Sequence, residues 1–152
     1  MKNLIYKPVV LFMAANTMLM INSCSKNVVQ EVQQTALQKQ FEDNILNQNF
    51  RVHLATDNGS DLTGEYTGYT FVLYKSTYYN GPMTAVKNAV SYNGTWSCNE
   101  DYSQLVISFP SAPPEFIFLN RPWKFTKKSL PIMELAPWGN LEPKVLQMER
   151  FY

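Results

Sequence analysis

The residues of this chain that could carry thiol or imidazole chemistry are one histidine, His53, and two cysteines, Cys24 and Cys98. A Ser-His-Asp or Cys-His relay must use His53 as its base, and the common zinc sites need several more ligands. His53 lies in a run typical of a strand, and nothing near it marks a nucleophile turn. We therefore predict no catalytic residue, no metal site, no cofactor and no enzyme activity, and we expect Cys98 to be a small buried hydrophobe.

The acidic residues indicate no stronger site. Residues 57–61 (Asp-Asn-Gly-Ser-Asp) could suggest calcium, but glycine stands where an EF-hand loop needs its third-position and twelfth-position ligands. These residues predict a hairpin loop instead. Paired carboxylates could hydrolyse glycosides, and the acids available are Glu65, Glu100, Asp101 and Glu134. Glu100-Asp101 falls at a predicted turn and Glu134 interrupts an apolar run, so we expect all three to face solvent.

Cys24 follows a leader-like segment. Residues 1–7 carry two lysines, residues 8–21 are almost wholly apolar, and Ile21-Asn22-Ser23-Cys24 comes next. This is the order of a signal peptide and its cleavage site. The apolar run has 14 residues, which is short of the roughly 18 that a membrane-spanning helix needs. The segment resembles the lipobox of bacterial lipoprotein signal peptides, which implies that residues 1–23 are removed and that Cys24 is acylated, with palmitate-type chains.

The resemblance also implies a location. Each buried methylene of an acyl chain contributes about 0.8 kcal/mol, so several chains on Cys24 would hold the protein at a membrane. We expect the bacterial cell envelope, at the outer membrane, facing either the periplasm or the cell surface. Without residues 1–23 the chain keeps 11 basic and 12 acidic residues, which gives no electrostatic reason to expect nucleic acid as a partner.

After Cys24 the residue pattern changes once, near Phe50, from a pattern typical of a helix to one typical of strands. Residues 24–27 are a predicted tether, and residues 28–46 predict a helix, with apolar residues at mixed three- and four-residue steps and no Pro or Gly. From Phe50 onward, Asn, Gly and Pro separate short runs of β-branched and aromatic residues. We predict eight strands, near 49–56, 64–76, 82–88, 90–98, 103–110, 115–125, 129–136 and 144–151.

Three Asn-Gly pairs, at 58–59, 80–81 and 93–94, are hairpin signals. The third pair leaves two alternatives. Either Asn93-Gly94 is a turn, or the turn is at Lys87-Asn88 and Gly94 lies inside a strand, and we favour the second. Because sequential strands with alternating apolar residues and short connections favour an antiparallel meander, we predict an all-β, eight-stranded up-and-down barrel with one N-terminal helix.

The region from Phe50 to Phe151 resembles the lipocalin-like lipoproteins of Bacteroidetes-type bacteria. The resemblance lies in short patterns, among them Gly68-Tyr69-Thr70-Phe71, Gly94-Thr95-Trp96 and Trp123-Lys124-Phe125. It implies a single lipocalin-like domain over residues 28–152, with the barrel at about 49–152. The lipocalin Gly-x-Trp normally lies on the first strand, whereas here it falls in mid-chain, so no ligand pocket is transferred residue by residue.

Aromatic residues are the remaining candidates for a function. If they line an open barrel they could hold a small apolar or amphipathic ligand; if they fill it they are a core. The leading expectation is therefore ligand binding, and the alternative is a filled barrel that acts as a non-catalytic protein-interaction accessory of an envelope complex. Tyr74, Tyr78 and Tyr79, near Asn80-Gly81, could also recognise a partner or a sugar. The candidate ligand-binding residues are Tyr69, Phe71, Trp96, Phe109, Trp123 and Phe125.

Overall fold

The computed structural model describes residues 22–111 and 113–152, so most of the predicted leader lies outside the described residues. The described residues fall into two units that divide between Ala36 and Leu37. Helix α2 (Asn22–Asn44) begins in the first unit and ends in the second. The helix starts six residues before the predicted residue 28, and the residues of the predicted tether are helical.

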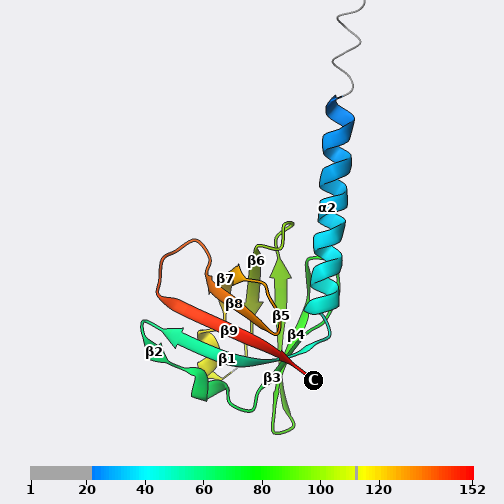
Figure 1. Cartoon of the computed structure of the whole chain (residues 1–152). Helices are drawn as coiled ribbons and strands as arrows, with labels where there is room; N and C mark the ends of the chain where they lie inside the picture. The colour runs from blue at the N-terminus through cyan, green and yellow to red at the C-terminus, as the bar shows by residue number, and fades with distance from the viewer. Residues whose placement is uncertain (1–21, 112) are drawn as a thin grey trace, which may run out of the picture. The chain divides into compact units, whose positions relative to one another are not determined.

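The second unit is a closed antiparallel barrel (Figure 1). Eight strands follow one another around it, β1 pairs with β9 to close the ring, and the two-residue β2 is an added hairpin arm on β1. The predicted all-β barrel with one N-terminal helix is therefore confirmed. The strands are β1 (Asn49–Asp57), β2 (Ser60–Asp61), β3 (Thr70–Leu73), β4 (Asn80–Lys87), β5 (Val90–Cys98), β6 (Gln104–Ser108), β7 (Arg121–Lys127), β8 (Ile132–Pro137) and β9 (Lys144–Phe151).

Two predicted strands begin as 3-10 helices instead. The predicted strand 64–76 overlaps η1 (Thr63–Tyr66), which precedes the short β3, and the predicted strand 115–125 overlaps η2 (Pro114–Ile117), which precedes β7. Pro114 has no N–H to give to a ladder and its fixed φ suits a first helical turn. Gly68, with φ +85°, then turns the chain out of η1.

One of the three Asn-Gly pairs is a hairpin turn. Asn58 and Gly59 both have positive φ and join β1 to β2, whereas the pairs at 80–81 and 93–94 lie inside β4 and β5. The β4–β5 turn is at residues 88–89, both with positive φ, as a two-residue type I′ connection requires. The favoured alternative, with Gly94 inside a strand, is confirmed to within one residue.

Gly94 is required by packing. A Cβ at this position would stand 2.4 Å from the carbonyl oxygen of Ser108 and 2.6 Å from the ring of Phe109. The Ser108 carbonyl is part of the β6 backbone, so it could not move away without distorting that strand. Only a residue without a side chain lets β5 and β6 approach this closely.

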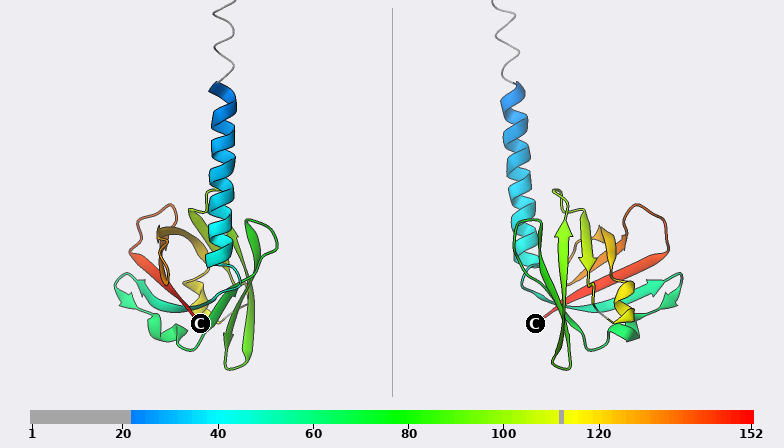
Figure 2. Two further views of the ribbon diagram at one scale, coloured as in Figure 1. Left: turned by 45° about the vertical axis from the view of Figure 1, so that its right-hand side comes forward. Right: turned by 180° about the vertical axis from the view of Figure 1, so that it is seen from behind.

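The inward-facing residues fill the barrel, because strand side chains alternate between the two faces of the sheet. Residues at 69, 71 and 73, at 105, 107 and 109, and at 146 and 148 are all buried, as the alternation predicted. The last part of α2 lies against one end of the barrel through Phe41, and Ile45 and Leu46, which directly follow the helix, are buried there as well. The helices η1 and η2 lie at the opposite end, on the connections next to β1 and β7 (Figure 2).

Candidate functional site

The residues predicted to line a ligand cavity form the solid interior of the barrel. Five of the six are at most 5% exposed, and their rings contact one another or further buried rings. Tyr69 lies 6.0 Å from Phe71 and Phe71 lies 6.4 Å from Phe109, between ring centroids. The structure therefore brings most of the predicted residues together as a core. The five are Tyr69, Phe71, Trp96, Phe109 and Trp123.

Phe116, which the strand prediction for 115–125 overlooked, closes the end of the barrel next to η2. Its ring is fully buried and lies 5.0 Å from those of Tyr69 and Phe109, between centroids. Tyr66 donates a hydrogen bond to the carbonyl of Glu115 at 2.6 Å, and Tyr69 donates one to its carboxylate at 3.1 Å. We call Phe116, together with Tyr66, Tyr69 and Glu115, the η2 plug. The signal that could have indicated it is the helix-starting pair Pro113-Pro114 followed by an acid.

The opposite end is closed by the C-terminal part of α2. Phe41 inserts its ring 5.4 Å from Trp96 and 4.9 Å from Tyr102. The Trp96 indole donates to the carbonyl of Tyr74 at 2.7 Å, and the Tyr102 hydroxyl donates to the carbonyl of Tyr78 at 2.9 Å. Both polar groups are thus satisfied where they are buried. We call this closure the helix cap.

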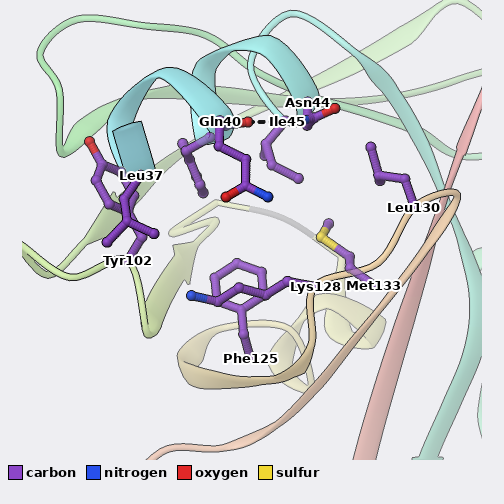
Figure 3. Close-up of a pocket in the computed structure, with 10 residues that line it drawn as sticks. Leu37, Gln40, Asn44, Ile45, Tyr102, Phe125, Lys128, Leu130 and Met133 are labelled. Atoms are coloured by element: carbon purple, nitrogen blue, oxygen red, sulfur yellow. Dashed lines mark hydrogen bonds between the residues drawn. The ribbon is translucent and has the colours of Figure 1, made fainter. Parts of the chain in front are cut away.

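A small cleft remains between the helix cap and the barrel mouth (Figure 3). Its volume is about 50 Å³, far below the roughly 300–1,000 Å³ of a typical small-molecule site. Phe125, the sixth predicted ligand-binding residue, lies here, below the helix and beside Met133. The lining residues are Leu37, Gln40, Phe41, Asn44, Ile45, Tyr102, Phe125, Lys128, Leu130 and Met133.

The candidate chemical residues are dispersed. His53 is the extra residue of a bulge in β1, and its Nδ1 lies 3.5 Å from the carboxylate of Glu149 on the outer wall. Cys98 lies partly buried at the end of β5, where burial raises the pKa of its thiol to about 12 and so keeps it protonated and unreactive. Within residues 22–111 and 113–152, no group of three histidine, cysteine or acidic residues could hold a metal ion.

The acids considered for catalysis are also separate from one another. Glu100 and Asp101 are exposed in the connection after β5, as predicted, and hydrogen bonds from Ser103 lower the pKa of Asp101. Glu65 lies in η1. Glu134 faces outward from β8, also as predicted, and its carboxylate accepts hydrogen bonds from Thr126 at 3.0 Å and Gln147 at 2.8 Å.

On the outer wall over β1, β7, β8 and β9, several charged and polar side chains bond to one another. Arg51 and Glu149 are joined by a 2.7 Å ion pair, which lowers the pKa of Glu149, and the bonds around Glu134 continue the network across β8 and β7. At the end of β9, Lys144 forms an ion pair with Asp57. We call this surface the paired face.

The outer wall over β4, β5 and β6 is different. None of the outward residues of these strands is charged, and Lys87, the last residue of β4, lies instead over the ring of Tyr69. In the part of the chain that the structure describes, no side-chain hydrogen bond joins these outward residues to another residue. We call this surface the neutral face. Its central members are Asn80, Pro82, Thr84, Asn93, Thr95, Ser97, Val106 and Ser108.

The neutral face is hollowed next to the loop between β3 and β4. An open depression of about 520 Å³ lies over the end of the face that adjoins this loop, lined mainly by small polar residues and apolar ones. Tyr74, at the head of that loop, is 40% exposed. Tyr78 is exposed as well and stacks under the Lys75 ammonium, 4.5 Å from its ring centroid. Tyr79 instead packs against Tyr102, 5.6 Å away between centroids.

Helix α2 contains Cys24, the predicted lipid acceptor. In the described residues no helix combines the length and the apolar character needed to cross a bilayer.

Taken together, the sheet order and the closure of β1 on β9 define an eight-stranded antiparallel barrel with a side-chain core. A solved structure shares this architecture. It is a DUF4847 family protein from Bacteroides vulgatus, similar with a TM-score of 0.51 and 16% identity over 71% of this chain and 95% of the other. The likeness establishes a common fold. No family model and no curated protein matches the sequence.

Proposed function

We propose that this chain is a lipid-anchored, non-enzymatic protein of the bacterial cell envelope that binds its partner on the outer surface of a filled barrel. The observation that carries the proposal is the packed interior. The largest residues of the barrel are almost fully buried against one another, so a ligand would have to displace the core. This favours the alternative in which the barrel is filled and the outer surface does the binding.

The anchor is argued from the lysine-bearing start, the apolar run and the small residue before Cys24. The test is expression of the full chain in a bacterium that processes lipoproteins, with a clickable palmitate analogue in the medium. We expect label on the wild-type protein and its recovery with membranes, and neither in Cys24→Ala. Cys98→Ala is the matched control and should keep both the label and the membrane fraction. Equal labelling of Cys24→Ala would contradict the anchor.

A second candidate function is favoured by the cleft at the helix cap. Its floor is apolar, while Gln40 and Lys128 stand at its exposed rim. Because the cleft holds only about 50 Å³, it could accept the apolar end of an amphipathic ligand and not the whole molecule. Native mass spectrometry of the protein taken from its own cells tests this function. A co-purifying small molecule that is lost in Met133→Trp, which fills the cleft, would support it, whereas a protein of unliganded mass would contradict it.

A further inference from the structure

One row of the neutral face places an aromatic ring and a proline beside two hydroxyl residues. Leu73 pairs with Met83, and the backbone N–H of Tyr74 donates to the carbonyl of Pro82 at 2.9 Å, so Tyr74 and Pro82 are opposite each other. Pro82 pairs in turn with Thr95, and Thr95 with Ser108. Residues paired in this way point to the same face. The row therefore runs Tyr74, Pro82, Thr95, Ser108 across four strand positions.

The dimensions of this row suit an elongated ligand. Three inter-strand steps of about 4.8 Å each give it a length of about 14 Å. The neighbouring row adds Asn80 and Ser97, which pair with each other, and both border the same hollow as Pro82 and Thr95. The hollow thus offers hydroxyl and amide groups beside the apolar surfaces of Pro82 and Val106. Tyr74 is not part of its lining, but it lies opposite Pro82 at the end of the row.

The polar groups of the row are available to a ligand. Thr95 of the row and Asn80 of the neighbouring row are exposed, and in the described residues neither side chain hydrogen-bonds to another residue. On the paired face, by contrast, comparable groups such as Thr126 and Gln147 are already bonded to Glu134. A ligand on the neutral face would therefore form hydrogen bonds without breaking any within the protein.

The chemistry of the face selects the class of ligand. An anionic ligand requires a cation, and no outward residue of β4, β5 or β6 is charged. A protein partner requires a core of large apolar anchors, whereas hydroxyl and amide groups predominate here. A sugar ring has an apolar C–H face that stacks on tyrosine and an edge of hydroxyls that both donate and accept hydrogen bonds.

We infer that the neutral face binds a neutral oligosaccharide, with its sugar rings stacked on Tyr74 and Pro82 and its hydroxyls bonded to Thr95, Ser108 and Asn80. This inference rests on the proposed function, since it names the partner that the outer surface would bind. It requires only the barrel, and neither the acyl anchor nor the helix-cap cleft takes part in it.

The test is isothermal titration calorimetry of the full-length protein, purified in detergent, with maltoheptaose, cellohexaose and mannohexaose. We expect saturable binding of at least one of them. Thr95→Arg places a long charged side chain in the hollow and should weaken that binding about tenfold or more, a loss of about 1.4 kcal/mol. Tyr74→Ala should weaken it in the same direction.

Thr126→Arg is the matched control, because it makes the same change at an exposed threonine on the paired face. It should bind as the wild type does, and thermal melting should show both arginine variants folded. Absence of binding to all three sugars, or an equal loss in the two arginine variants, would overturn the inference. A photo-crosslinker at residue 95 that captures a protein, with no sugar bound, would overturn it while leaving the proposed surface-binding function and its anchor intact.

Discussion

The two ends of the barrel are closed by different means. At one end the η2 plug is continuous with the strands, and Asn120 fixes it by bonding both the N–H and the carbonyl of Phe109, at 2.7 and 3.1 Å. At the other end the helix cap packs the ring of Phe41 against Trp96 and leaves a cleft beside it. Both ends belong to one buried core. Only the helix cap borders an open cleft, however, so the free energy of unfolding should depend on the two ends unequally.

The largest expected effect is at the η2 plug. Phe116→Ala removes a fully buried ring and leaves a cavity inside the aromatic cluster, and we expect the free energy of unfolding to fall by about 3–5 kcal/mol. Urea denaturation followed by tryptophan fluorescence measures the change. Ile117→Ala, the next residue and 69% exposed, is the matched control and should change stability by less than about 0.5 kcal/mol.

The helix cap should respond less. Phe41→Ala removes a ring that is 7% exposed and borders the cleft, so the vacated space can be hydrated or filled by movement of the helix. We expect a loss of about 2–3 kcal/mol, below the usual range for a phenylalanine in a closed core. Leu37→Ala, one helical turn away and 37% exposed, should have little effect. A larger loss for Phe41→Ala than for Phe116→Ala would reverse the ranking of the two ends.

Both ends contain a tyrosine whose ionisation would disrupt the packing. Burial raises the pKa of Tyr69 at the η2 plug and of Tyr102 at the helix cap to about 12, from an ordinary value of 10.0. Because the folded state then holds these protons more tightly than the unfolded state, stability should be full below pH 10 and should fall as the pH rises toward 12. Unfolding curves measured across this interval, with tyrosinate absorbance recorded alongside, test the window.

Tyr69→Phe and Tyr102→Phe separate the contributions of the two ends to this alkaline loss. Each variant should retain more of its stability above pH 10 than the wild type. An alkaline loss that neither variant reduces would show that other groups cause it.

The smallest effect is expected on the wall between the two ends. Glu134→Ala breaks hydrogen bonds to Thr126 and Gln147 on a face that water reaches, so we expect less than about 0.5 kcal/mol of destabilisation. Differential scanning calorimetry is sensitive enough to compare the melting temperatures. A large drop in the melting temperature would show that the paired face contributes to the fold as strongly as the ends do.

The part of the fold that the sequence could predict was the alternation of buried and exposed residues along the strands. Alternating apolar residues placed 69–73, 105–109 and 146–148 correctly, because one-sided burial imposes that pattern on an antiparallel sheet. Asn-Gly was a weaker guide. Gly81 lies in a strand because the loop after β3 folds directly over it, with the carbonyl of Tyr74 where a Cβ would stand, and local sequence does not encode that packing.

The candidate binding surface could not be predicted in the same way. A row such as Tyr74, Pro82, Thr95 and Ser108 exists only once the register between strands is known, and a shift of one residue would break it. That register is fixed by the turn at residues 88–89, which no Asn-Gly pair marks. The η2 plug was overlooked for a different reason. Phe116 lies in a run whose residues suit a strand, and only Pro114 indicates that a helical turn begins there.

The pairing of β1 with β9 has a consequence for how the chain reaches its native state. Residues 49–57 pair with residues 144–151, whereas β1 shares one ladder pair, Phe50 with Phe71, with β3. The first strand therefore lacks its main partner until β9 has been synthesised. Contacts so distant in sequence slow folding, and a chain truncated before β9 would leave the ring open along its whole height.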